Sequence, residues 1–256
     1  MAPGFAVVMG RAGPVSGEVL SSERMKVAAI VPAAGRGLRM GGSVPKQFLS
    51  IGGLPLVVHS LRALQASAAI DVIVLAVPQT DIAYCRNEIV EAHGFTKVTQ
   101  IIAGGKERQD SVRNALAAVP EDIDIVVVHD AVRPFLGPEM IHDVILSARS
   151  RGAAIVALPM RDTVKQVGAD RVIERTLDRR PLWLAQTPQA FRRDWLLDAH
   201  RRAQLEGVLA TDDAYLIEWA GHSVSVVEGS GENIKVTRPE DMIIGEAIMA
   251  SRRSSL

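Results

Sequence analysis

Short apolar segments alternate with longer amphipathic segments between Val27 and Leu158. Apolar runs of strand length that end at glycine, proline or charged residues indicate β-strands, and apolar residues that recur every three or four positions indicate helices. The predicted strands are Val27–Val31, Asp71–Val77, Lys97–Ile102, Ile123–Val128 and Ala153–Leu158, and the predicted helices are Pro55–Gln65, Thr80–Ala92, Arg108–Ala118 and Pro138–Ser150. This alternation predicts an α/β fold with a mostly parallel sheet flanked by helices.

The segment from Pro159 to Pro181 follows a different pattern. Thr163–Val167 and Arg171–Leu177 are typical of two strands around a turn, and neither is apolar enough for the interior of a sheet. They predict a projecting β-hairpin arm at about residues 159–182. Because an isolated hairpin is marginally stable at best, we expect the arm to pack against a second subunit and to make the protein a homodimer.

The remainder of the chain returns to regular elements. Trp183–Phe191 leads back into the body, and the pattern then predicts helices Asp194–Glu206 and Asp212–Trp219, a strand Ser223–Val227 and a last helix to about Ser251 with Thr237 as N-cap and Pro239 in its first turn. Residues 1–24 carry scattered glycine, proline and serine without a period, which predicts a disordered extension. We therefore expect a single domain from residue 25 to residue 256.

The composition limits which partners the protein can bind and indicates its cellular compartment. Lys plus Arg and Asp plus Glu are 29 each, so no overall field attracts nucleic acid or an acidic membrane. No apolar run approaches the ~18 residues that span a bilayer. Cys85 is the only cysteine, which excludes an internal disulfide and a cysteine-built metal site. These features favour a cytoplasmic protein that binds neither nucleic acid nor membrane.

The most informative segment runs from Ile30 to Gln47. The first predicted strand ends at Pro32, and four glycines follow within ten residues, which lets the backbone approach a ligand closely. Arg39 and Lys46 lie in this segment, and there is no acidic residue between Glu23 and Asp71. Converging backbone amides and two cations in an acid-free segment predict a phosphate-binding loop. The alternative is a glycine-rich surface turn with solvated cations.

Two familiar phosphate loops do not fit this spacing. A Walker loop needs glycine, four residues and then Gly-Lys-Ser/Thr, and no such string occurs. A dinucleotide fingerprint needs a third glycine where Met40 stands, and an acid ~20 residues further on that the sequence lacks. An NAD-dependent reductase is therefore disfavoured.

Further charged residues follow predicted strands at the same edge of the sheet. Asp130 and Arg133 come directly after Ile123–Val128, and ligands of open α/β sheets bind at the carboxyl ends of the strands. With Arg39, Lys46 and Lys235 they form a set of cations around one carboxylate. Cations neutralise phosphoryl charge and a carboxylate can hold Mg²⁺, which favours transfer chemistry on a nucleoside triphosphate with a divalent cation as cofactor.

The motifs together resemble the 2-C-methyl-D-erythritol 4-phosphate cytidylyltransferases of the non-mevalonate isoprenoid pathway, over roughly Lys26 to Ala250. The first motif alone marks only the wider nucleotidyltransferase superfamily, whereas the arm and the last motif are more specific. The residues that carry the resemblance are Pro32-Ala33-Ala34-Gly35 with Arg39-Met40, Pro45-Lys46-Gln47, Gly104-Gly105 with Glu107-Arg108 and Ser111-Val112, Val128-His129-Asp130-Ala131 with Arg133-Pro134, Arg161-Asp162-Thr163, Thr187-Pro188-Gln189, Thr211-Asp212 and Asn233-Ile234-Lys235-Val236-Thr237. Departures are Arg36 where an aromatic residue is common, Lys106 where an acid can stand, and residues 1–24.

The resemblance implies a Rossmann-like nucleotidyltransferase fold and a sequential transfer of CMP from CTP to methylerythritol phosphate, without a covalent enzyme intermediate. It implies that the phosphate of the polyol attacks as an anion, so no general base is needed and His129 is expected to be structural. The implied nucleotide-binding residues are Ala33, Ala34, Gly35, Gly105, Ser111 and Asp130, and Asp130 is also implied to hold Mg²⁺. The implied catalytic residues are Arg39, Lys46, Lys235 and, from the partner subunit's arm, Arg179. The implied polyol-binding residues are Arg133, Thr163, Thr187 and Thr211.

Two other interpretations stay open at this point. A cytidylyltransferase acting on ribitol 5-phosphate shares the fold, the nucleotide and most of the motifs. A nucleotide-binding regulatory module without chemistry is the alternative from a different class, although the presence of both Arg39 and Lys46 argues against it.

Overall fold

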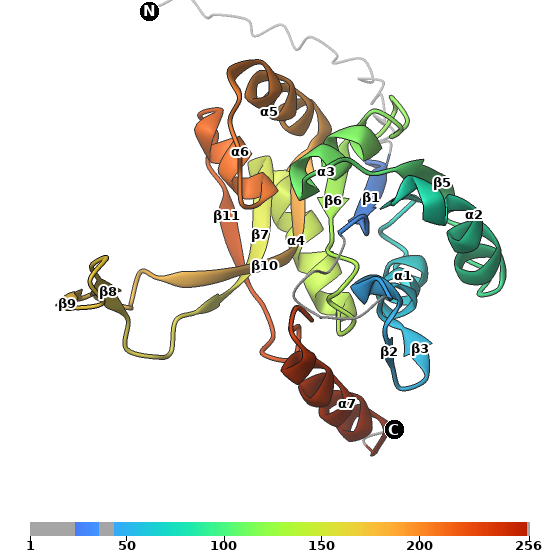
Figure 1. The fold of residues 1–256 in the computed structure, drawn as a ribbon. Helices are drawn as coiled ribbons and strands as arrows, with labels where there is room; N and C mark the ends of the chain where they lie inside the picture. Colours follow the sequence, from blue (N-terminus) through green and yellow to red (C-terminus); the bar gives the residue numbers. More distant parts are fainter. Residues whose placement is uncertain (1–23, 36–43, 255–256) are drawn as a thin grey trace, which may run out of the picture.

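The computed structural model describes residues 24–35 and 44–254, and within them a seven-stranded sheet forms the centre (Figure 1). Its order is β11-β7-β10-β6-β1-β4-β5, and all neighbours are parallel except that β10 is antiparallel to both β6 and β7. The mostly parallel α/β sheet that the sequence predicts is confirmed. The strands are β1 Val27–Pro32, β4 Val72–Val77, β5 Val98–Ala103, β6 Ile125–Val128, β7 Ala153–Pro159, β10 Trp183–Arg192 and β11 Ser225–Glu228.

Helices cover both faces of the sheet because the central strands are apolar on both sides. In β1, Val27, Ala29 and Val31 pack on one face with α1 and α4, whereas Ala28 and Ile30 pack on the other with α3, α5 and α6. Burial on both faces is the usual state of a parallel strand. The helices are α1 Leu56–Ala66, α3 Arg108–Leu116, α4 Pro138–Arg151, α5 Arg193–Glu206, α6 Asp213–Trp219 and α7 Pro239–Ser254. In the described ranges, no helix combines the length and the apolar content that crossing a membrane requires.

Two predicted helix starts differ from the structure. The segment predicted as one helix from Thr80 consists of a 3-10 turn Gln79–Asp81, a short α2 Ile82–Tyr84 and a π-helical stretch Cys85–Glu91. Thr80 does not cap it, because its hydroxyl donates to the Asp81 carboxylate instead.

At α7, the Asp241 carboxylate accepts from the Thr237 N–H and hydroxyl, 2.7 and 3.0 Å away. The same carboxylate also accepts from the Arg238 N–H at 2.8 Å, so Asp241 binds the N–H groups that precede the helix. The Thr237 hydroxyl is used as a donor to Asp241 and does not act as the predicted cap.

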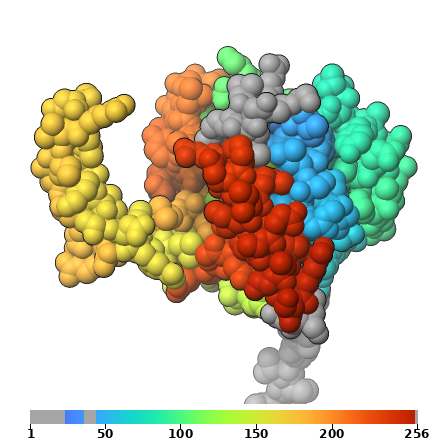
Figure 2. Space-filling view, turned by 60° about the horizontal axis from the view of Figure 1, so that its bottom comes forward, coloured from blue at the N-terminus to red at the C-terminus, as the bar shows by residue number. Residues whose placement is uncertain are grey.

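The predicted hairpin arm is confirmed, with shorter strands than expected. β8 Lys165–Val167 and β9 Ile173–Thr176 pair antiparallel and project away from the sheet, beyond the ends of β7 and β10 (Figure 1). Figure 2 shows the same arm, in yellow, extending from the body of the molecule. Every residue of both strands is exposed. The expected extension at residues 1–24 lies outside the described residues except for Arg24, which pairs with Asp71.

A small apolar cluster joins the C-terminal helix and the segment before it to the loop after β6 and to α1. It consists of Ile51, Leu56, Val132, Phe135 and Val236, all buried. α7 lies close against the short hairpin strand β2 Ser50–Ile51, since a Cβ on Gly245 would come within 2.4 Å of Ile51. The loop after β6 and the segment before α7 therefore share one core, and both carry charged residues that the sequence assigns to the site.

We predict that Phe135→Ala lowers the free energy of unfolding by about 3–5 kcal/mol, because a fully buried aromatic side chain leaves a cavity in this cluster. Urea denaturation measures the change. The matched control is Leu205→Ala on α5, whose side chain is 81% exposed and should cost less than about 0.5 kcal/mol. Equal losses for the two variants would show that the cluster contributes no particular stability.

Candidate active site

Two adjoining hollows open at the carboxyl ends of the parallel strands. The first is lined by the segment after β1, the loop before α3 and the loop after β6, and the second by the loop after β6, the middle of β10 and the start of α6. Arg108, Asp130 and Lys235 line both hollows and form the wall between them. Other lining residues include Ala33, Ala34, Gly35, Lys46, Gly105, Lys106, Glu107 and Ser111 in the first hollow, and Arg133, Gln186, Thr187, Gln189, Thr211 and Asp212 in the second.

The structure brings most of the predicted site residues together. All of the predicted nucleotide-binding residues line the first hollow together with Lys46 and Lys235, and Arg133, Thr187 and Thr211 line the second. Arg39 lies outside the described residues. Thr163 and Arg179 are exposed on the arm and line neither hollow, and an Arg179 Nη1 donates to the Arg161 carbonyl of the same arm.

Glycines shape the first hollow through close packing. A Cβ on Gly104 would lie 2.3 Å from the Ala34 Cβ and 2.8 Å from Ser111 Oγ. The Gly105 N–H donates to Ser111 Oγ at 3.0 Å, and this hydroxyl donates to the Glu107 carbonyl at 3.1 Å. The loop before α3 can therefore approach the segment after β1 only because Gly104 carries no side chain. A Cβ on Gly105 would lie 2.2 Å from the Asp110 Cβ, so this second glycine lets the loop pack against α3 itself.

Asp130 is the centre of the wall between the hollows. Its Oδ1 accepts from Arg108 Nε at 2.8 Å, and its Oδ2 pairs with Lys235 Nζ at 2.7 Å and lies 3.9 Å from Arg133 Nε. Burial alone would raise the pKa of Asp130, but Arg108 and Lys235 outweigh it and hold that pKa well below its ordinary value. Asp130 is therefore a fixed anion that gathers three cations.

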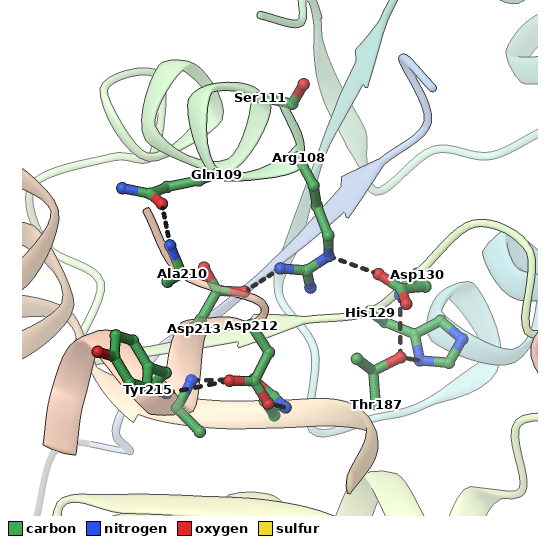
Figure 3. Close-up of polar contacts among 12 residues, drawn as sticks. Arg108, Gln109, Ser111, His129, Asp130, Thr187, Ala210, Asp212, Asp213 and Tyr215 are labelled. Carbon is green, nitrogen blue, oxygen red and sulfur yellow. Dashed lines mark hydrogen bonds and ion pairs between the residues drawn. The ribbon is translucent and has the colours of Figure 1, made fainter. Parts of the chain in front are cut away.

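Arg108 was not assigned a role from the sequence, although it stands in one of the motifs. Its Nη1 donates to Asp213 Oδ2 at 2.7 Å while its Nε binds Asp130, so one guanidinium bridges two carboxylates (Figure 3). Arg108 is also the first residue of α3, where the helix dipole disfavours a cation. An arginine at the start of a predicted helix is the sequence signal that could have indicated a specific carboxylate partner.

Behind the wall, a hydrogen-bond chain orients Asp130. The Asp130 N–H donates to Thr187 Oγ1 at 3.0 Å, and the Thr187 hydroxyl lies 3.2 Å from His129 Nδ1. His129 Nε2 lies 3.1 Å from the Arg133 carbonyl. With a proton on Nε2, His129 donates to that carbonyl and accepts from Thr187, so the neutral ring satisfies every contact. Burial lowers the pKa of His129 to about 4, which fits a structural residue.

The segment before α7 is held against the same loop. Arg133 Nη1 donates to the Asn233 carbonyl at 2.7 Å, and Asn233 Nδ2 donates to the Thr187 carbonyl at 2.9 Å. The Val236 N–H donates to the Val132 carbonyl at 2.9 Å. These contacts on both sides of Lys235 place its ammonium group against Asp130.

The far side of the second hollow is the start of α6. Asp212 caps this helix by accepting from the Tyr215 N–H at 3.0 Å, and Gln189 Nε2 donates to the same carboxylate at 2.9 Å (Figure 3). Thr211 directly precedes the cap and is exposed at the edge of the hollow. Strand β10 thus fixes the position of the α6 start through Gln189.

Asp130 is also the carboxylate predicted to hold Mg²⁺. In the part of the chain that the structure describes, no group of three or more His, Cys, Asp or Glu side chains could hold a metal ion. Both oxygens of Asp130 face cations. A single carboxylate cannot supply the six oxygen ligands of Mg²⁺, so these residues do not fit a metal ion held by the protein alone. They fit a metal ion that is bound mainly by the oxygens of a triphosphate, with Asp130 as one further ligand.

Comparison with protein families identifies the group to which this arrangement belongs. Residues 27–251 match the family model of 2-C-methyl-D-erythritol 4-phosphate cytidylyltransferase. The chain belongs to this family. The match runs from β1 into α7 and so includes every described element that lines the two hollows.

Individual cytidylyltransferases agree with the family match. The enzyme of that name from Pelotomaculum thermopropionicum is 51% identical over 231 residues, which cover 90% of this chain and 97% of the relative. The one from Syntrophus aciditrophicus is 50% identical over 224 residues, 88% and 96% of the two chains. Among solved structures, 4-diphosphocytidyl-2C-methyl-D-erythritol synthase from Anaerococcus prevotii has a TM-score of 0.78 at 29% identity, covering 88% and 96% of the two chains. The cytidylyltransferase from Thermus thermophilus has a TM-score of 0.73 at 32% identity, covering 88% and 100%.

We predict that His129 makes the free energy of unfolding decrease as the pH is lowered from about 6.5 toward 4. Because its pKa is about 4 when folded and 6.5 when unfolded, the unfolded state binds the extra proton, and stability that is complete above pH 6.5 is lost as the pH falls toward 4. The loss should reach roughly 3 kcal/mol.

Urea denaturation at several pH values between 4.5 and ~7 measures this loss. His129→Gln keeps a donor for the Arg133 carbonyl and cannot titrate, so its stability should depend less on pH. His142→Gln, at an exposed position on α4, is the control and should keep the wild-type slope. A wild-type slope in His129→Gln would show that other groups cause the acid loss.

Proposed function

We propose that the protein transfers CMP from CTP to 2-C-methyl-D-erythritol 4-phosphate, releases pyrophosphate and forms 4-diphosphocytidyl-2-C-methyl-D-erythritol. The observation that carries this proposal is the pair of adjoining hollows with one charged wall, in a chain of the cytidylyltransferase family. One hollow suits each substrate, and the shared wall lies where the two would meet. The match over residues 27–251 supports a single nucleotidyltransferase domain from residue 25 onward.

In this proposal CTP occupies the first hollow. Ala33, Ala34 and Gly35 lie near the base and the phosphates, where small residues let backbone amides approach the anion. Gly105 and Ser111 lie on the cytosine side, and Asp130 lies near the ribose. The segment that contains Lys46 adds no carboxylate to this hollow, because residues 24–70 include no Asp or Glu.

The polyol phosphate occupies the second hollow, where Arg133, Thr187 and Thr211 line its walls. Lys235, at the wall, turns from Asp130 toward the incoming phosphate and positions it. A phosphate oxygen attacks the α-phosphorus of CTP in line, the new P–O bond forms, and the bond to the oxygen that bridges to the β-phosphorus breaks. The electron pair leaves with pyrophosphate, so no proton has to move and His129 can stay neutral.

Lys46 and Arg39 are the proposed transition-state stabilisers. Lys46 lines the first hollow beside Gly35, whose added Cβ would lie 3.8 Å from the Lys46 Cε. Arg39 is proposed from the family motif, since it lies outside the described residues. Both would neutralise charge that builds up on the phosphate oxygens. When bound, Mg²⁺ would neutralise the triphosphate further, held by its oxygens and by Asp130.

We also propose a cytoplasmic homodimer that forms through the arm at residues 159–182. The arm and the adjoining start of β10 expose apolar side chains that water does not favour, namely Val167, Val172, Ile173, Trp183 and Leu184. Thr163 and Arg179 lie outside both hollows of their own chain. They would therefore complete the second hollow of the partner subunit, where the planar Arg179 fork grips the polyol phosphate.

Pyrophosphate release tests this function. CTP is incubated with Mg²⁺ and, in separate reactions, with 2-C-methyl-D-erythritol 4-phosphate and with ribitol 5-phosphate. The proposal predicts release with the first compound and at least ~10²-fold lower kcat/KM with the second. The reverse preference would assign the ribitol enzyme, and binding of CTP without release for any polyol phosphate would favour a regulatory module.

We predict that Lys46→Ala lowers kcat by about 10²- to 10³-fold with the fold intact, because it removes one preorganised charge from the transition state. Steady-state kinetics and the melting temperature measure both parts. Lys106→Ala removes another cation from the lining of the first hollow and is the control, because Lys106 is exposed and departs from the family pattern. Turnover of a folded Lys46→Ala protein near the wild-type rate would remove Lys46 from the catalytic set.

We predict that Arg179→Ala raises KM for the polyol phosphate or lowers kcat and barely changes CTP binding. If Arg179 acts across the dimer, mixing Arg179→Ala subunits with Lys46→Ala subunits gives heterodimers in which one site carries both defects and the other carries neither. Activity should then recover in part after subunit exchange. Exchange without recovery would contradict action on the partner's site.

A further inference from the structure

Arg108 has no part in the transfer described above, although it lines both hollows. Its place in the helix does not explain it, because a cation as the first residue of α3 is disfavoured by the helix dipole. Its Nη2 is buried and, among the described residues, has no hydrogen-bond partner. An unpaired buried donor costs free energy of folding. Stability of α3 therefore gives no reason for an arginine at this position.

The two contacts of Arg108 join elements that are distant in the sequence. Nε binds Asp130, which follows β6 and pairs with Lys235, and Nη1 binds Asp213, the first residue of α6. Asp213 is 1% exposed, and its other oxygen lies 3.1 Å from His200 Nε2 on α5. Asp213 is thus fixed in the helical layer behind the site.

On the other side, the start of α6 forms part of the second hollow. Thr211 and Asp212 precede Asp213 directly and line that hollow. Figure 3 shows the Arg108 guanidinium between the Asp130 and Asp213 carboxylates, with Asp212 and Thr187 below it. The bridge thus joins the wall between the hollows to the far side of the second one.

We propose that Arg108 is a positioning residue of the transfer reaction: by bridging Asp130 and Asp213, it fixes the wall between the hollows relative to the start of α6 while both substrates are bound. This proposal rests on the proposed function. When Lys235 turns toward the incoming phosphate, Arg108 is the cation that stays on Asp130. The carboxylate then keeps both its place and its charge compensation.

The geometry of the side chain explains why arginine is needed. A guanidinium offers donors in several fixed directions, so its Nε and Nη1 can bind carboxylates on two separate elements. A lysine at position 108 would keep the positive charge but would present one point of contact. Burial tends to lower the pKa of Arg108, but Asp213 and Asp130 outweigh this effect and raise it, so the bridge stays charged.

The experiment compares Arg108→Lys, Asp213→Asn and the double variant with the wild-type protein. For each, kcat and KM are measured for CTP and for 2-C-methyl-D-erythritol 4-phosphate separately, together with the melting temperature. The control is Arg113→Lys on the same helix. Arg113 pairs with Asp110 at 2.9 Å and its side chain is as exposed as that of Arg108, 27% against 25%, but it lines neither hollow.

We expect Arg108→Lys to lower kcat/KM for the polyol phosphate by at least ~10-fold, toward the ~10²-fold that a small misplacement costs. KM for CTP should stay within about threefold, a split that general loss of stability would not produce. Asp213→Asn should act in the same direction. The double variant should be within about twofold of Arg108→Lys, because both changes break the same bridge.

Three results from the variants would overturn the proposal. One is a folded Arg108→Lys protein with both substrates' kinetic constants within about twofold of wild type, as Arg113→Lys should be. Another is full additivity of the two substitutions. If Arg108→Lys does not fold, unchanged kinetics of Asp213→Asn decide against it. A wild-type protein that releases no pyrophosphate with any polyol phosphate overturns the proposed function together with this one, whereas an active wild type with unaffected variants overturns this one alone.

Discussion

A buried carboxylate surrounded by cations organises this site. Asp130 lies at the end of β6, in contact with Arg108 and Lys235 and within 3.9 Å of Arg133. Cations placed close together for phosphate binding repel one another before the phosphates arrive, and a fixed anion among them offsets that repulsion. The hydroxyl of Thr187 holds the backbone at this position by accepting from the Asp130 N–H. The rest of the site depends on this arrangement, because each wall residue takes its position from Asp130.

The arrangement suits a reaction in which the protein supplies position and charge while the substrates supply the reacting groups. The two hollows meet at one wall, so a phosphate in the second can reach a triphosphate in the first directly. Neither hollow needs a protein nucleophile or base. His129 is buried and neutral, with its pKa lowered to about 4, and the Cys85 thiol is buried elsewhere with its pKa raised by burial to about 12. Catalysis by positioning and electrostatic stabilisation is typical of phosphoryl and nucleotidyl transfer.

Much of this could be predicted from the sequence, for an identifiable physical reason. The sheet follows from local patterns, since strands such as β6 are apolar throughout and their carboxyl ends meet at one edge. Glycines and isolated charges after those strands therefore predict the site. The bridge from Arg108 to Asp213 could not be predicted, because it joins residues 105 positions apart through side chains on two helices. Thr80 and Thr237 were wrong as caps because their hydroxyls donate to the neighbouring carboxylates of Asp81 and Asp241 instead of accepting from the first turn of a helix. The proposed role of Arg179 depends on a second chain, which local patterns cannot show.

The central claim is that CMP passes between two bound substrates in one displacement. The most direct measurement uses CTP made chiral at the α-phosphorus by a sulfur atom, with 2-C-methyl-D-erythritol 4-phosphate as acceptor. The configuration at phosphorus in the product is then determined. A single in-line attack inverts it, and inversion is the result that this account predicts. Retention would require two displacements and a covalent nucleotidyl–protein intermediate, and would contradict the account.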